Sequence, residues 1–135
     1  MNSPFSVVSQ AGWAGFAAIG LGAMLGAWLR FVLGAVFNQM IEALPLGTLL
    51  ANLIGAFLVG LAIAWLARHP ELSAAWRLFL ITGFLGALTT FSTFSAESIE
   101  LLRRGDHWWA LMHAGLHLAG SLLMAAVGFS LVQPR

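Results

Sequence analysis

The chain has 135 residues, of which 60% are hydrophobic and only 8% are charged. Soluble domains carry charge on roughly a quarter of their residues, so this composition excludes a soluble globular protein. The net charge of only +1 argues against a nucleic-acid-binding surface. The lack of cysteine excludes disulfides and thiolate metal sites.

The apolar residues fall into four long runs, and a run of about 20 apolar residues can cross a bilayer as a helix. Four such helices use almost the whole chain, which leaves no room for a soluble domain. The sequence therefore predicts one all-α integral membrane domain over residues 1–135. The four helices are expected at about residues 13–36, 46–67, 73–102 and 108–132.

The first predicted helix is rich in glycine. Gly22 and Gly26 form a GxxxG pattern, which lets a second helix approach closely. Arg30 lies near the far end of this helix. It is either a side chain that snorkels to the interface or a vestibule charge that attracts anions.

The second predicted helix carries Thr48 and Asn52 on one face, because they are four residues apart. Asn52 is costly in lipid, since its amide needs hydrogen-bond partners. Two interpretations stay open: Asn52 bonds to another helix and holds the bundle together, or it donates into a pore.

The third predicted helix is too long for one straight span unless it is tilted or broken. Glycines and β-branched residues make the segment Gly83–Thr90 the expected place for a break. A break frees carbonyl oxygens, and such backbone survives in a membrane only where it is buried in protein, lines water or binds an ion.

Hydroxyl and aromatic side chains alternate just after this expected break. Phe91 and Phe94 are neighbours on one helical face, and Thr90, Ser92 and Thr93 lie among them. Ring edges are positive, so two rings with hydroxyl donors could form a weak, dry site for a small anion. Plain packing is the alternative interpretation of the phenylalanine pair.

Glu97 has no basic residue three or four positions away, so we expect it to face the protein interior. On the fourth predicted helix, His113, His117 and Ser121 recur every four residues and share a face. This spacing favours a hydrogen-bonded polar stripe. The two histidines could also bind a metal, but the sequence shows no third ligand.

The arginines are balanced between the two sides of a four-helix topology, so the positive-inside rule gives no orientation. Such a chain can insert both ways and form an antiparallel, dual-topology homodimer, with the symmetry of inverted-repeat transporters. If both breaks meet on the two-fold axis, their carbonyls could bind a dehydrated cation. The balance is between Arg68, Arg77 and Arg135 on one side and Arg30, Arg103 and Arg104 on the other.

Three segments of the chain resemble the CrcB/Fluc fluoride-channel family. They are residues 22–31 (GAMLGAWLRF), 47–55 (GTLLANLIG) and 83–95 (GFLGALTTFSTFS). The third segment is the most specific, and the resemblance covers essentially all four helices. It implies a non-enzymatic channel in the inner membrane of a prokaryote, through which fluoride leaves the cytoplasm passively.

The resemblance also implies roles for individual residues. Arg30 would sit in the vestibule, and the carbonyls of Gly86 and Thr89 would hold a central sodium ion at the interface of an antiparallel homodimer. Ring edges, the Asn52 amide and hydroxyl groups would line the fluoride path. The implied pore residues are Asn52, Thr90, Phe91, Ser92, Thr93, Phe94 and Ser121.

Two departures from the family pattern stand out. Ala87 occupies a position where a second glycine is common, which costs some backbone freedom. The histidine pair of the last helix stands where Tyr or Ser is expected, so His117 could substitute for a hydroxyl donor.

Three rival functions fit some of these features. A proton-coupled exporter of small cations, like the small multidrug-resistance proteins, would need a membrane-embedded acid, and only Glu97 could serve. A non-transporting assembly subunit would use Asn52 and the hydroxyls only to join helices. An intramembrane metalloenzyme would be built on His113 and His117.

Overall fold

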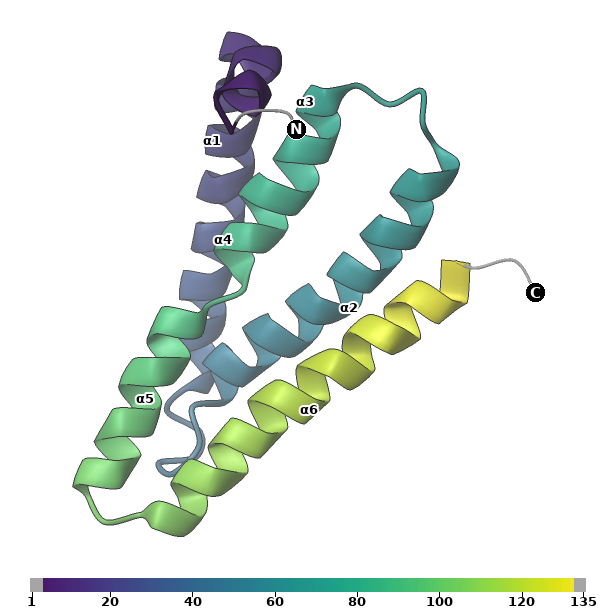
Figure 1. Ribbon diagram of the computed structural model, residues 1–135. Coiled ribbons are helices and arrows are strands. Elements are labelled where there is room, and N and C mark those ends of the chain that lie inside the picture. Colours follow the sequence, from purple (N-terminus) through teal and green to yellow (C-terminus); the bar gives the residue numbers. More distant parts are fainter. Residues whose placement is uncertain (1–3, 133–135) are drawn as a thin grey trace.

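A computed structural model describes residues 4–132, with side chains described from residue 12 onward. The structure is all-helical in this range (Figure 1). Its elements are α1 (Pro4–Phe37), α2 (Leu46–Arg68), α3 (Ala74–Arg77), η1 (Leu78–Leu85), α4 (Gly86–Leu88), α5 (Phe91–Arg103) and α6 (His107–Val132).

Within the described residues, four segments are long and apolar enough to cross a membrane: Gly12–Phe37, Leu46–Arg68, Ala74–Arg103 and His107–Val132. The predicted four-span architecture is therefore confirmed, and the chain is a multi-pass membrane protein. Gly12 has φ 56° and ψ −175°, so α1 is kinked at the start of the first span. The dual-topology dimer stays a prediction.

The first span packs along the first half of the third span, and close backbone contact between them depends on glycines. A Cβ atom on Gly22 or Gly26 would collide with the backbone of η1, including the Phe84 peptide. Gly83 on η1 lies in turn against Ile19 and Gly22 of α1. The GxxxG pattern thus marks a helix interface, as predicted.

The second and fourth spans form the other close pair, and they run side by side in the same direction (Figure 1). Gly60 of α2 faces the backbone of Ala125 and Phe129, and Gly128 of α6 faces the Phe57 carbonyl. Small residues on both helices therefore let the two backbones touch, which supplies packing energy where lipid offers no hydrophobic drive.

The third span changes its helical geometry twice. It begins as the α-helical turn α3 and continues as the π-helix η1, at whose end the Gly86 N–H reaches back to the Ile81 carbonyl. After the single turn of α4, Thr89 and Thr90 adopt extended conformations and the chain restarts as α5. The break predicted for residues 83–90 therefore falls at its C-terminal end, on the two adjacent β-branched residues.

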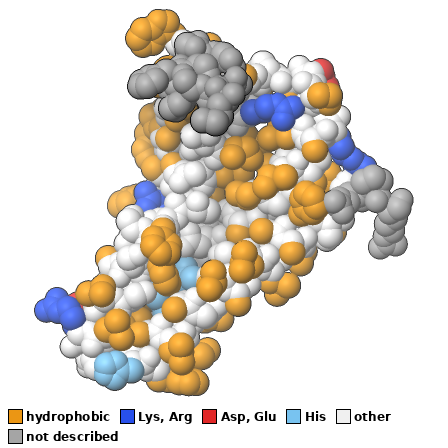
Figure 2. All heavy atoms as spheres, in the orientation of Figure 1, with side chains coloured by type: hydrophobic (Ala, Val, Ile, Leu, Met, Phe, Trp, Pro, Cys, Tyr) orange, Lys and Arg blue, Asp and Glu red, His pale blue; other side chains and the backbone are white. Residues whose placement is uncertain are grey.

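A hydrophobic surface covers much of the face seen in Figure 2, as expected for side chains that meet lipid or another subunit. The buried core is small and centres on Ala51, Leu85 and Leu88. Arg135, which the predicted charge balance includes, lies outside the described residues.

Candidate functional site

The break in the third span is held by one side chain from the second. The Thr90 N–H donates to Asn52 Oδ1 at 2.7 Å, and Asn52 Nδ2 donates to the Thr90 carbonyl at 3.0 Å. The amide of Asn52 thus pairs with both polar groups of one residue, much as a neighbouring strand would. This satisfies the buried backbone groups at the position where the helix stops supplying hydrogen-bond partners.

Thr90 also starts the next helix. Its Oγ1 accepts a hydrogen bond from the Thr93 N–H at 3.1 Å, which is the N-cap interaction that threonine favours. The same hydroxyl lies 3.0 Å from Thr93 Oγ1 and 3.3 Å from Ser92 Oγ. Three hydroxyls are thereby joined at the beginning of α5.

The break removes the helical donors of two carbonyls. In a continuous helix, the Gly86 and Thr89 carbonyls would accept from the N–H groups of Thr90 and Thr93. Those N–H groups donate to Asn52 Oδ1 and Thr90 Oγ1 instead. Gly86 is exposed on the single chain. The two carbonyls predicted to hold a sodium ion have therefore lost the donors that a continuous helix would give them.

Most of the predicted pore residues surround one cavity. It has a volume of about 450 Å³ and lies between the break, α2 and α6. Its polar lining comes from Asn52, Thr89, Thr90, His117 and Ser121. The rings of Phe91 and Phe94 complete the wall, so the cavity combines hydrogen-bonding groups with aromatic rings and no formally charged lining residue.

A second cavity, of about 400 Å³, shares Thr90 with the first as a lining residue. Arg30, Asn38, Thr48 and Thr93 contribute to its lining. Arg30 Nη1 donates to Thr93 Oγ1 at 3.4 Å. The predicted vestibule charge therefore stands next to the predicted pore residues. Ser92 is exposed and lines neither cavity.

Aromatic rings from α5 and α6 form a connected group. The ring centroids of Phe91 and Phe94 are 5.4 Å apart, with a tilt of 43°. Phe94 then stacks on His113 at 5.0 Å and contacts His117 at 4.9 Å. Phe91 is 78% exposed on the single chain, so its outer face is free to meet lipid or a partner subunit.

The structure reveals a contact that the sequence did not predict, between Asn52 and His117. Asn52 Nδ2 lies 2.9 Å from His117 Nδ1. Because Thr90 fixes the orientation of the amide, Nδ2 is the donor and Nδ1 must accept. Neutral His117 therefore carries its proton on Nε2. The four-residue spacing of His113, His117 and Ser121 on α6 was the only sequence signal.

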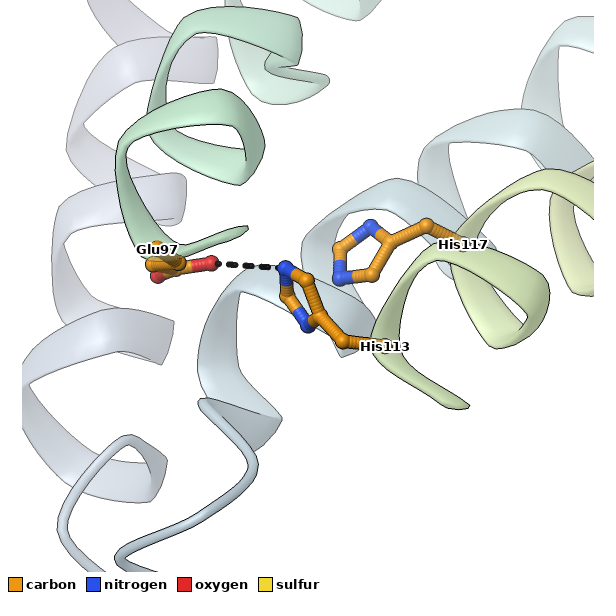
Figure 3. Close-up of side chains that lie close together, drawn as sticks. All are labelled: Glu97, His113 and His117. Atoms are coloured by element: carbon orange, nitrogen blue, oxygen red, sulfur yellow. Dashed lines mark ion pairs between the residues drawn. The ribbon is translucent and has the colours of Figure 1, made fainter. Parts of the chain in front are cut away.

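Glu97 faces the interior, as its lack of a basic neighbour predicted. Its Oε1 accepts from Thr48 Oγ1 at 2.5 Å, and its Oε2 lies 3.6 Å from His113 Nε2 (Figure 3). Asn38 Oδ1 accepts from the Thr48 N–H at 3.1 Å, which fixes the loop behind this contact. Glu97 is thus a third potential metal ligand beside the two histidines, which the sequence did not reveal.

Comparison with known proteins identifies relatives over most of the chain. The model of the family described as "CrcB-like protein, Camphor Resistance (CrcB)" matches residues 17–129. A Pseudomonas putida protein named "Fluoride-specific ion channel FluC" is 59% identical over 113 residues, covering 84% of this chain and 89% of the relative. Proteins of the same name from Cupriavidus metallidurans and Aromatoleum aromaticum are 54% and 52% identical. These two matches cover 84% and 85% of this chain, and 90% and 88% of the relatives.

Proposed function

The chain belongs to the CrcB-like family, and on that premise we propose that it is a fluoride-selective channel through which fluoride leaves the cytoplasm passively. The observation that carries the proposal is the cavity at the helix break. It brings an amide, hydroxyls and two phenylalanine rings together in a chain whose relatives are named fluoride channels.

The lining suits a small, strongly hydrated anion. Fluoride must lose water to enter a narrow path, so each lost hydrogen bond needs a replacement. Hydroxyl donors such as Ser121 and the positive edges of Phe91 and Phe94 can provide weak replacements. Weak sites permit release as well as entry, which conduction requires.

Asn52 contributes in a specific way. Both of its N–H groups are engaged, one by the Thr90 carbonyl and the other by His117 Nδ1. The bond to Thr90 holds the break together. We infer that fluoride accepts the hydrogen bond of the second N–H in place of His117. Asn52 then exchanges one acceptor for another, and its amide is never left without a partner.

Arg30 supplies a positive charge beside the second cavity, where it can raise the local anion concentration without standing in the narrow part of the path. The joined hydroxyls of Thr90 and Thr93 line the second cavity with Arg30, and Thr90 also lines the first cavity. The rival exporter function loses support, because the relatives are named fluoride channels and Glu97 is engaged by Thr48.

The proposed working form is an antiparallel homodimer with a sodium ion at its centre, in the inner membrane of a prokaryote. Three features of the single chain support this: the exposed Phe91 ring, the exposed Gly86 with its freed carbonyl, and an apolar cavity of about 390 Å³ between α2 and the third span. Carbonyls of Gly86 and Thr89 from two chains would supply four oxygens, the ligand type that a hard cation prefers. The ion would be structural.

A growth experiment tests the proposed function in cells. The gene is expressed in a bacterial strain that lacks its own fluoride exporter, and growth is followed at increasing fluoride. We expect the wild-type chain to restore growth and an Asn52→Leu chain of equal abundance in the membrane to restore it poorly. Unchanged fluoride sensitivity with abundant membrane-inserted wild-type protein would contradict the proposal.

A further inference from the structure

Three potential metal ligands from two helices converge beside the 450 Å³ cavity, which His117 lines. His113 and His117 lie one turn apart on α6, and Glu97 projects from α5 toward them (Figure 3). One ligand atom of each residue lies within 4.8 Å of the other two. His113 is fully buried, His117 is 6% exposed and the Glu97 side chain is 16% exposed. These groups are brought together inside the protein, where charge and polarity are costly.

The converging atoms also lack partners. Glu97 Oε2, His113 Nε2 and His117 Nε2 are buried without a hydrogen bond among the described residues. A buried polar group without a hydrogen-bond partner destabilises the folded protein. Several such atoms directed at one small region indicate that a cation, which oxygen and nitrogen lone pairs can coordinate, completes the site.

We propose that Glu97, His113 and His117 bind a divalent transition-metal ion such as Zn²⁺. Two imidazoles and one carboxylate form a common three-ligand zinc set, which leaves a fourth position for water or another ligand. Imidazole-rich sites prefer Zn²⁺, Cu²⁺ or Ni²⁺ over Mg²⁺ and Ca²⁺, whose ligands are oxygens. Access is available through the 450 Å³ cavity, because His117 lines it.

The hydrogen bond between Asn52 and His117 makes metal binding incompatible with the arrangement described above. Metal coordination by His117 Nε2 moves the imidazole proton to Nδ1, which can then no longer accept from Asn52 Nδ2. The metal therefore displaces His117 from Asn52 and places positive charge next to the anion path. An added inference, which rests on the proposed function, is that the bound metal inhibits fluoride flux.

Metal binding is tested first, without any transport assay. Zn²⁺ is titrated into the purified full-length protein by isothermal calorimetry, after removal of any polyhistidine tag. We expect one ion per chain. His113→Gln and Glu97→Gln should weaken binding by more than the roughly 10- to 100-fold typical of losing an outer-shell partner. Glu97→Gln keeps an oxygen that can accept from Thr48, so it tests the ligand with little disturbance of the fold.

The matched control is His107→Gln, the same substitution at an exposed histidine at the start of α6. It should bind Zn²⁺ as the wild type does. Size-exclusion chromatography shows whether each variant keeps the elution volume of the wild type. Absence of binding to well-folded wild-type protein would overturn the proposal. So would Zn²⁺ binding that survives both His113→Gln and Glu97→Gln.

The His117 tautomer has a separate readout. Asn52→Leu removes the competing hydrogen-bond donor, so folded Asn52→Leu protein should bind Zn²⁺ more tightly than the wild type does. Weaker binding would contradict the competition. Inhibition is then measured as fluoride efflux with and without Zn²⁺, relative to each variant's own metal-free flux. His113→Gln should lose the inhibition and His107→Gln should keep it.

These readouts separate the two proposals. If the protein binds Zn²⁺ at the triad but passes no fluoride, the metal site stands and the proposed function fails. If fluoride flux is present but Zn²⁺ neither binds nor inhibits, the metal site fails and the channel stands.

Discussion

Asn52 and Thr90 are joined by two hydrogen bonds, of 2.7 Å and 3.0 Å, between one side-chain amide and one residue's backbone. The residues are 38 positions apart in sequence and belong to different spans. This pairing allows the third span to stop and restart within the membrane, because the backbone groups that leave the helix are satisfied by the second span. The cavity, the N-cap of α5 and the freed carbonyls all depend on it.

Replacement of Asn52 by leucine should reduce both flux and stability. The Thr90 N–H and carbonyl would lose their partners, and an unsatisfied buried group costs roughly 1–3 kcal/mol. Loss of a hydrogen bond to a charged ion, worth about 1.5–3 kcal/mol, should lower fluoride efflux by about tenfold or more. Efflux from liposomes and thermal unfolding in detergent measure the two effects. Gln39→Leu, at an exposed amide in the loop after α1, is the control and should change neither.

Replacement of Phe94 by leucine should lower fluoride efflux while preserving assembly. Leucine keeps an apolar side chain but lacks the positive ring edge, and the stacking of Phe94 on His113 is also lost. Phe16→Leu is the control, because Phe16 is 52% exposed on α1 and does not line the cavity. Equal efflux rates for the two variants, at equal protein content, would count against a role for the Phe94 ring.

Gly60→Ala should destabilise the protein far more than Gly20→Ala. A Cβ atom on Gly60 would collide with the Ala125 carbonyl, whereas one on Gly20 meets nothing within 4 Å. Overpacking typically costs about 1–3 kcal/mol, and backbone offers little room to relax. The fraction of protein that stays monodisperse after heating reports the difference. Similar heat resistance in both variants would argue against the α2–α6 contact.

Sodium should stabilise the assembled protein if the freed carbonyls of Gly86 and Thr89 bind it. A ligand that binds only the folded state raises stability with its concentration. The unfolding temperature should therefore rise when Na⁺ replaces N-methylglucamine at constant ionic strength, and K⁺ should have a smaller effect because it is larger. An unfolding temperature that is independent of the cation would speak against a sodium site.

The sequence was sufficient to predict the four spans, the glycine contacts of α1 and a break in the third span. These features follow from hydropathy, from small residues at helical spacing and from adjacent β-branched residues, all of which are local. The break lies at Thr89 and Thr90, the last two residues of the predicted segment. The π-helix at Leu78–Leu85 was not predicted, because its shifted hydrogen-bond register depends on packing against α1.

The sequence predicted which residues form the candidate site, but it did not predict the contacts among them. The roles of the predicted residues, from Asn52 to Ser121, stay predictions. What the sequence could not reveal is that Asn52 bonds to His117 and that Glu97 approaches His113. Each contact joins residues from different spans, and it depends on how helices rotate against each other. Spacing within one helix carries no such information.

Passive fluoride conduction is tested most directly by reconstituting the purified protein in liposomes loaded with fluoride. Efflux is followed with a fluoride electrode after valinomycin provides a return path for charge, and chloride-loaded liposomes serve as the comparison. We expect fast fluoride loss that requires valinomycin, with little chloride loss. Fluoride retention by liposomes that contain folded protein, or equal loss of both anions, would contradict the account.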